Sequence, residues 1–130
     1  SVAEKYNRRA GNCVSNGIWN KVTIKDHHKI LHHMVRLGRI KRGSFVLDWG
    51  SGCGHSLQFL SAEYSVHGVG IDVSNLTIAY ARENTTKANM HCVADGSRLQ
   101  WIASNTFDHV LSFGSIYHVY NRTTFCHVLR

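Results

Sequence analysis

A glycine-rich loop that directly follows a short apolar run is the feature that most constrains the fold of this chain. Residues 44–48 read SFVLD, and glycines follow at positions 50, 52 and 54. A continuous apolar run of this kind is typical of a strand buried in a parallel sheet. Glycine permits the tight turn and the close backbone approach of a ligand that a loop leading into a helix requires. The stretch therefore predicts a buried strand, a ligand-binding loop and a helix in direct succession.

Strands and helices alternate along the rest of the chain. A helical spacing of apolar residues, with Thr23 and Asp26 as a capping pair, predicts a helix that ends near Gly38. Further strands are expected at residues 66–71, 90–94 and 107–113, and further helices at residues 57–64, 74–81 and 121–130. This alternation indicates βαβ units, hence a parallel sheet with helices on both faces. The predicted class is α/β, a doubly wound Rossmann-like sheet.

The chain of 130 residues is typical of a single domain, and no proline, repeat or linker divides it. Residues 1–22 are polar and contain Gly11 and Gly17, which predicts an N-terminal arm with a short helix followed by an irregular segment. Residues 23–130 carry the alternating pattern and are expected to form one ligand-binding domain.

The chain is basic, with a formal net charge of +7 and a sequence pI near 9.5. No aromatic residues are interleaved with the basic ones as in an RNP-like motif, so nucleic-acid binding has weak support and a solvated basic face is favoured. No apolar run approaches the roughly 20 residues that span a bilayer, and the N-terminus lacks the apolar core of a signal peptide. We expect no membrane partner and a cytoplasmic location.

Cysteine and histidine content gives no metal signature. The four cysteines are widely spaced without a CxxC pair: Cys13, Cys53, Cys92 and Cys126. Free thiols in a reducing compartment are therefore expected, and the N-x-S/T triplets at positions 75, 84 and 121 are attributed to chance. His28 and His32 lie one helical turn apart, but two ligands without a third make a poor site, so no metal is predicted.

Acidic residues follow the first three predicted strands: Asp48, Asp72 and Asp95. In doubly wound sheets the ligand binds beyond the carboxyl ends of the strands, so these side chains are expected to face one crevice. A dinucleotide loop is the main alternative, because its G-x-G-x-x-G also follows a first strand. Here the glycines fall as G-x-G-x-G, His55 takes the third dinucleotide position, and Asp48 precedes the loop. An acid at that position suits a cationic amino group better than a pyrophosphate.

Four segments together carry a family resemblance: VLDWGSGCGH, VGIDVS, ADGSRL and FDHVLSFGSIYHV. In order and spacing they resemble motif I, the acidic loop, the adenine loop and motif IV of class I S-adenosylmethionine-dependent methyltransferases, especially those with small-molecule acceptors. The resemblance covers residues 44–130, the cofactor-binding half of such a domain. It implies the cofactor S-adenosylmethionine and a methyl transfer by in-line displacement.

The resemblance also implies roles for individual residues. Asp48 would contact the methionine end of the cofactor, above a loop shaped by Gly50, Ser51, Gly52 and Gly54. Asp72 would bind both ribose hydroxyls, while Val73 and Ser74 flank the adenine, Asp95 and Gly96 read its edge, and Ser112 lies under the sulfonium. Tyr117 and His118 are candidate catalytic bases. Residues 1–22 would act as a lid, with Tyr6 and Trp19 as candidate aromatic contacts.

The sequence departs from the family in supplying evidence for four of the seven expected strands. We therefore expect a truncated domain, or one whose open sheet edge is covered by a subunit partner or a second copy. Two functions are considered: a methyltransferase acting on a small molecule, and a non-catalytic S-adenosylmethionine-binding module. An NAD-binding domain is a more distant alternative. No NPPY-like segment follows the fourth strand, which favours a small-molecule acceptor over nucleic-acid bases or glutamine.

Overall fold

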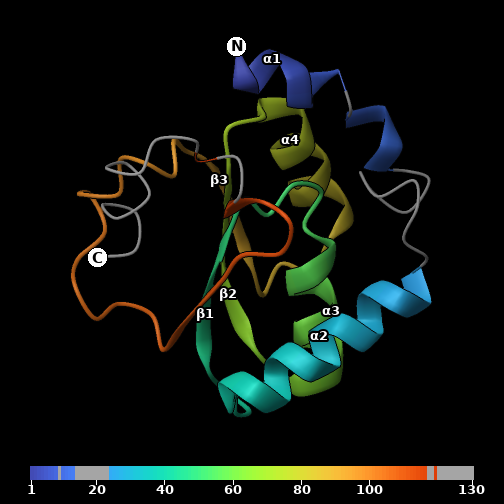
Figure 1. The fold of residues 1–130 in the computed structure, drawn as a ribbon, viewed down its shortest axis with the longest axis vertical. Helices are drawn as coiled ribbons and strands as arrows, with labels where there is room; N and C mark the ends of the chain where they lie inside the picture. The colour runs from blue at the N-terminus through green and yellow to red at the C-terminus, as the bar shows by residue number, and fades with distance from the viewer. Residues whose placement is uncertain (9, 14–23, 117–118, 120–130) are drawn as a thin grey trace.

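A computed structural model describes residues 1–8, 10–13, 24–116 and 119. Helices and strands alternate from α2 (Ile24–Gly38) to β3 (Met90–Val93), as the sequence predicts, and an irregular segment then leads to β4 (His109–Leu111) (Figure 1). In chain order the elements are α1 (Val2–Asn7), the 3-10 helix η1 (Ala10–Cys13), α2 (Ile24–Gly38), β1 (Phe45–Trp49), α3 (His55–Tyr64), β2 (His67–Asp72), α4 (Asn75–Asn84), β3 (Met90–Val93) and β4 (His109–Leu111).

The strands form one parallel sheet in the order β3-β2-β1-β4. Asp48 of β1 is paired with Gly70 of β2, and Asp72 at the end of β2 is paired with Val93 of β3. The chain therefore moves in one direction from β1 to β3 and then returns to the other side of β1. This reversal between β1 and β4 is the switch in strand order at which doubly wound sheets bind ligands. The predicted α/β class is confirmed.

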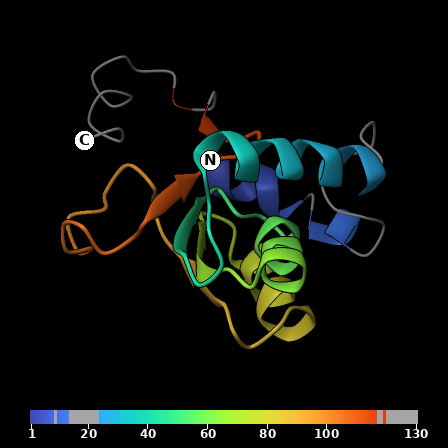
Figure 2. The ribbon, with the colours of Figure 1, turned by 90° about the horizontal axis from the view of Figure 1, so that it is seen from below.

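Different layers cover the two faces of the sheet. Alternate residues of β1 face opposite ways, so Val46 packs with Leu31 of α2 and Leu57 of α3, whereas Leu47 packs on the other face. Figure 2 shows the described helices on one side of the sheet. An irregular segment with Leu99, Ile102 and Phe107 covers the other side. The helix predicted at residues 121–130, a further candidate for that face, lies outside the described residues.

Local sequence signals account for the helices. In α2 the buried residues recur one turn apart, at His27, Leu31 and Val35, so that one face of the helix packs against the core. Ser74 caps α4 as predicted, because its Oγ accepts a hydrogen bond from the Thr77 N–H at 3.2 Å. The predicted Thr23 cap lies outside the described residues. Among those that are described, no helix combines the length and apolar character of a membrane span.

The fourth strand is shorter than the predicted range of 107–113. Before it, the Asp108 carboxylate accepts a hydrogen bond from the Phe45 N–H at 2.8 Å, and the Asp108 N–H donates to the Phe45 carbonyl at 2.8 Å. After it, Gly114 takes a φ of 70°, which ends the extended backbone. Within the described part of the chain β4 is an edge strand, and its Val110 is 68% exposed.

The prediction of four free thiols is wrong, because Cys13 and Cys53 form a disulfide. Their spacing in sequence gave no signal, since the pairing depends on the arm folding back onto the glycine-rich loop. Cys92 is a free, half-buried cysteine, and Cys126 lies outside the described residues. The expected cytoplasmic location rested in part on free thiols, and the disulfide removes that support because disulfides persist in oxidising surroundings.

Candidate functional site

The candidate site lies at the carboxyl ends of β1 and β2, around the glycine-rich loop. Gly50 has a φ of 77°, a conformation that disfavours residues with a side chain, and a Cβ there would meet Ser115 Oγ at 2.3 Å. The Ser115 hydroxyl donates to the Gly50 carbonyl at 3.0 Å. The loop after β1 is thus held against the segment after β4, at the switch in strand order. Ser115 was part of the resemblance to motif IV, but its contact with Gly50 carried no sequence signal.

Asp48 lies near the carboxyl end of β1, just before this loop, and is the most buried acid of the site, with 1% of its surface exposed. Within the described residues its Oδ2 atom has no hydrogen-bond partner. Burial, and secondarily the nearby carboxylate of Asp72, raise the pKa of Asp48 to about 7. A buried acid without a partner is energetically costly, and a donor or cation supplied by a ligand would relieve that cost.

The raised pKa makes stability depend on pH in a definite direction. Between the ordinary value of 3.8 and about 7, folded Asp48 keeps a proton that the unfolded chain releases. The free energy of unfolding should therefore fall as pH rises through this range, by at most about 1.4 kcal/mol per pH unit. Asp48→Asn should remove that contribution. Urea unfolding of both proteins at pH 5 to 8 measures the difference, and parallel pH profiles would contradict the prediction.

Asp72 connects the loops that follow β1 and β2. Its Oδ2 accepts from the Gly52 N–H at 3.0 Å, and its Oδ1 accepts from the Ser74 N–H at 2.9 Å. Burial raises the pKa of Asp72, and backbone hydrogen bonds from Ser74, Gly52 and Val73 partly oppose that shift. Each carboxylate oxygen can accept a second hydrogen bond. The side chain can therefore hold the loops and still accept a hydrogen bond from a ligand hydroxyl.

The N-terminal arm reaches this part of the site. Ser74 is fully buried, and its hydroxyl donates to Asn7 Oδ1 at 2.7 Å while capping α4. Val73 beside it is half-buried. Figure 1 shows α1 lying against the start of α4, in agreement with the contacts between these helices. Of the two arm aromatics, Tyr6 is half-buried, and Trp19 lies outside the described residues.

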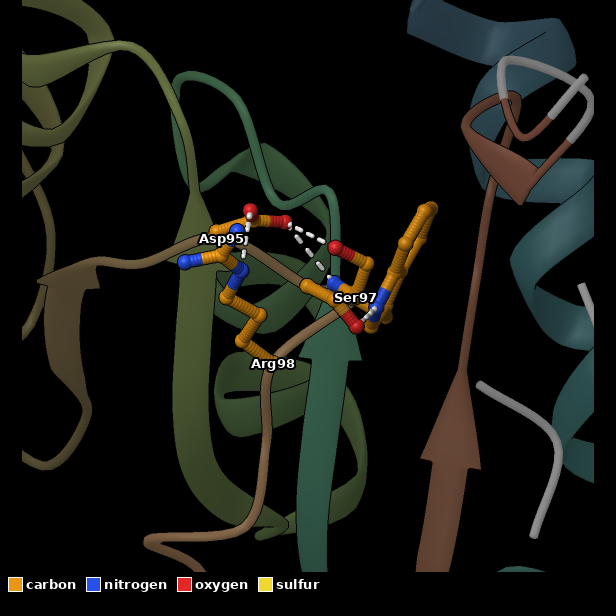
Figure 3. A network of polar contacts seen from close by, with 5 residues as sticks. Asp95, Ser97 and Arg98 are labelled. Atoms are coloured by element: carbon orange, nitrogen blue, oxygen red, sulfur yellow. Dashed lines mark hydrogen bonds and ion pairs between the residues drawn. The ribbon is translucent and has the colours of Figure 1, made fainter. Parts of the chain in front are cut away.

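Asp95 differs from Asp48 and Asp72 in its exposure, because it lies in an exposed turn after β3 (Figure 3). Its Oδ1 accepts from the Ser97 N–H at 2.9 Å and the Ser97 hydroxyl at 2.7 Å, and Arg98 lies 3.8 Å from Oδ2. The side-chain bond from Ser97, followed by its backbone bond, lowers the pKa of Asp95. The contacts of this carboxylate are with its own turn.

Trp49 holds the Asp95 turn against the end of β1. Its indole N–H donates to the Gly96 carbonyl at 3.0 Å, and a Cβ at Gly96 would approach Nε1 to 2.3 Å. Only glycine fits so close to the ring. Sequence reasoning selected Gly96 but not Trp49, although the tryptophan directly follows Asp48 in the glycine-rich stretch.

Two hydroxyls and two candidate bases complete the predicted set. The Oγ atoms of Ser51 and Ser112 are buried, and neither has a hydrogen-bond partner in the described part of the chain. Ser51 lies in the loop itself, and Ser112 directly follows β4. Tyr117 and His118, the predicted bases, lie outside the described residues.

Histidines line a neighbouring pocket that sequence reasoning did not assign to the site. His27, His28 and His55 border a cavity of about 260 Å³ between α2 and α3. His27 Nε2 lies 3.3 Å from Ser56 Oγ, and its ring centroid is 4.8 Å from that of Phe113. Burial, then the neighbouring His28 and His55, lower the pKa of His27 to about 4. In the sequence, the only indication that His27 would lie at this pocket was its position on the apolar face of α2.

The predicted histidine pair makes contacts with aromatic residues. His28 stacks on Phe59 with centroids 4.2 Å apart, and His32 lies edge-on to Phe59 at 5.1 Å and is hydrogen-bonded to the Tyr64 hydroxyl. In the described ranges, no three His, Cys, Asp or Glu side chains are grouped so that they could hold a metal ion.

Comparison with solved structures shows what this arrangement is similar to. A chain from the complex between the Haloferax volcanii Trm112 methyltransferase activator and a methyltransferase has a TM-score of 0.78 at 24% identity, over 96% of this chain and 52% of that one. A Methanococcus maripaludis protein described as an S-adenosyl-L-methionine-dependent methyltransferase has a TM-score of 0.78 at 18% identity, over 95% of this chain and 57% of that one. A Geobacter sulfurreducens methyltransferase in complex with S-adenosyl-L-homocysteine has a TM-score of 0.63 at 21% identity, over 83% of this chain and 43% of that one.

The chain thus spans about half the length of these structures. No curated protein matches it at a significant level. The family model described as a methyltransferase domain matches residues 46–130, more than half of the chain. With the parallel sheet, the switch in strand order and the glycine-rich loop, this match shows that the chain belongs to the class I S-adenosylmethionine-dependent methyltransferase domains.

Proposed function

We propose that this chain holds S-adenosylmethionine at the carboxyl ends of β1 and β2 and forms the donor half of a methyltransferase. Asp48 would face the methionine end, over the loop of Gly50, Ser51, Gly52 and Gly54. Asp72 would accept hydrogen bonds from the ribose hydroxyls, with Val73 and Ser74 beside the adenine. Asp95 and Gly96 would read the adenine edge, and Ser112 would lie beneath the sulfonium.

The observation that carries this proposal is the buried acid at the head of a glycine-rich loop, whose Oδ2 has no hydrogen-bond partner among the described residues. In its ionised form Asp48 would repel a pyrophosphate, whereas the α-amino group of a methionine moiety supplies a donor for Oδ2 and a positive charge that favours the ionised form. Asp72, whose hydrogen bonds described above all come from backbone N–H groups, retains acceptor capacity for a ribose. These contacts favour an amino-acid-bearing nucleoside over NAD.

The proposed reaction is methyl transfer to a small molecule. Bound S-adenosylmethionine supplies an electrophilic methyl group, so the chain has mainly to hold donor and acceptor in line, which contributes about 7–11 kcal/mol in the best intramolecular models. Residues 112–115 read SFGS, without the NPPY-like segment associated with amino-group acceptors on bases or glutamine. Tyr117 and His118 remain our candidates for removing a proton from the acceptor.

A protein partner is part of the proposal. The structural neighbour from Haloferax volcanii belongs to a complex with the Trm112 activator, and β4 of this chain presents an edge with Val110 exposed. An unpaired strand edge is ordinarily covered in a stable fold. We propose that additional polypeptide, from a subunit partner or a second copy, covers this edge.

Calorimetric titration with S-adenosylhomocysteine tests the donor site. We expect binding that NAD does not compete for, and we expect Gly50→Ala to weaken it by at least about tenfold, because the new Cβ collides with Ser115. Gly43→Ala is the matched control: Gly43 has a φ of 79°, but a Cβ there meets nothing within 4 Å. Absence of binding by the parent chain, or equal loss in both variants, would count against the proposal.

The second candidate is a non-catalytic S-adenosylmethionine-binding module. It is considered because the described contacts at the carboxyl ends of β1 and β2 concern the donor site alone. Incubation with methyl-labelled S-adenosylmethionine and a panel of small-molecule acceptors distinguishes the two. Label recovered in an acceptor supports the enzyme, and cofactor binding without any transfer supports the module.

A further inference from the structure

The N-terminal arm is attached to both loops of the candidate site. Cys13 of η1 is bonded to Cys53 in the loop after β1, and the His55 imidazole is hydrogen-bonded to the Cys13 backbone. Asn7 at the end of α1 accepts from Ser74 in the loop after β2 at 2.7 Å. α1 and η1 also pack on α4. The arm therefore bridges the two loops that would receive the nucleoside.

Cys53 occupies a position where a covalent bond acts directly on the loop backbone. The preceding Gly52 donates its N–H to Asp72, and the following Gly54 takes a φ of 80° as the N-cap of α3. Glycine-rich segments lose more conformational freedom on ordering than other segments. The disulfide restricts the loop and the arm before any ligand arrives, so less ordering remains to be done when the ligand binds.

We propose that the Cys13–Cys53 disulfide is a redox-controlled clamp that raises the affinity of this site for its nucleoside ligand. The proposal rests on the donor site described above. In the oxidised protein the arm is held across both loops. In the reduced protein the arm is held by noncovalent contacts, among them the Asn7–Ser74 hydrogen bond, and ligand binding must order the arm and the loop together.

Reduction would proceed by exchange with a dithiol. A thiolate of the reductant attacks one sulfur of the disulfide, which releases the other cysteine and forms a mixed disulfide. The second thiol of the reductant then displaces the remaining protein cysteine, and the reductant is left with its own internal disulfide. Two electrons and two protons thereby pass to Cys13 and Cys53. The two residues are 1% and 3% exposed, so the arm must move off the loop before the thiolate can attack. A ligand that favours the closed arm therefore slows reduction.

Thermodynamic linkage makes the clamp measurable from two sides. If the disulfide raises ligand affinity by some factor, the ligand must stabilise the disulfide against reduction by the same factor. A disulfide that serves only the stability of the fold would leave the affinity of the folded, reduced protein unchanged. The two cases therefore differ in a binding constant and not only in a melting curve.

The experiment uses the full chain with Cys92→Ser and Cys126→Ser, so that Cys13 and Cys53 are its only cysteines. Calorimetry measures S-adenosylhomocysteine binding to the oxidised protein and to the same protein reduced with dithiothreitol, with circular dichroism to confirm the fold of both. We expect the reduced form to bind about tenfold more weakly, within the usual range of coupled sites. Equal affinity of the two folded forms overturns the clamp and leaves the proposed function intact. Absence of binding by the oxidised form overturns both.

A second measurement covers the case in which the reduced protein does not stay folded. The rate of disulfide reduction by dithiothreitol is followed on the oxidised protein with and without saturating S-adenosylhomocysteine. We expect the ligand to slow reduction several-fold, whereas NAD, as the control nucleotide, leaves the rate unchanged. Equal rates with and without S-adenosylhomocysteine overturn the clamp.

Discussion

Asp72→Asn is expected to weaken S-adenosylhomocysteine binding by roughly 100-fold, since hydrogen bonds to charged groups contribute about 1.5–3 kcal/mol each. The amide keeps one acceptor oxygen and puts an NH₂ donor in place of the other. It therefore cannot accept from the Gly52 and Ser74 N–H groups and from two ribose hydroxyls at the same time. The loss combines weaker ribose contacts with a looser connection between the two loops. Calorimetric titration of the variant measures the effect.

Asp108→Asn is the matched control for that variant. Asp108 also accepts a backbone hydrogen bond, from Phe45 at 2.8 Å, but it does so before β4 and beside the start of β1, away from the carboxyl ends of the strands. We expect this variant to bind S-adenosylhomocysteine within about twofold of the parent, because it makes the same change of carboxylate to amide at a backbone contact outside the site. A change of less than about threefold in Asp72→Asn would contradict a ribose-binding role for Asp72.

Loss of the Cys13–Cys53 disulfide is expected to lower the free energy of unfolding by about 4 kcal/mol. The bond closes a loop between residues 40 positions apart, and its removal returns that conformational freedom to the unfolded chain. Urea unfolding of Cys13→Ser/Cys53→Ser against the parent measures the effect. Many domains have a stability of about 5–15 kcal/mol, so the variant should stay folded with a narrowed margin.

Cys92→Ser is the control for the stability experiment. Cys92 lies in β3, is half-buried and forms no disulfide, so its replacement removes no covalent cross-link from the unfolded chain. We expect a change of about 1 kcal/mol or less, in the range of ordinary single substitutions. If the paired variant lost no more stability than Cys92→Ser, the disulfide would contribute nothing to the fold and its presence in solution would be in question.

Close packing at two glycines organises the candidate site before the ligand binds. Gly50 and Gly96 each lie against a larger side chain, Ser115 and Trp49, which brings the turns after three strands together at one edge of the sheet. Asp48 is buried and Asp72 half-buried at this edge, and the loss of solvent raises the pKa of each carboxyl. Such a site is organised before the ligand binds, which reduces the ordering that binding requires.

The parallel sheet and the position of its ligand loop could be predicted from the sequence because they depend on local signals. The apolar runs that became β1, β2 and β3 begin and end within a residue or two of the predicted ranges. The Ser74 cap was read from its own hydroxyl and the helical pattern behind it. Hydrophobic periodicity and capping act over a few residues, and a single sequence displays them directly.

The contacts that complete the site join residues far apart in the chain. Asn7 meets Ser74 across 67 positions, and Ser115 meets Gly50 across 65. Cys13 meets Cys53 across 40, against the expectation of free thiols. No local pattern encodes such pairs, because each exists only once the elements have packed.

Residue type and spacing were enough to predict the α/β class, the glycine-rich loop after the first strand and the acids at the strand ends, whereas the order of the strands came from the fold. Only the tertiary structure decided how those acids differ. Packing buried Asp48 with its Oδ2 unpaired among the described residues, paired Asp72 with backbone N–H groups, and left Asp95 exposed in its own turn. The energy of a charge depends on the solvent and dipoles around it, and those are properties of the folded molecule.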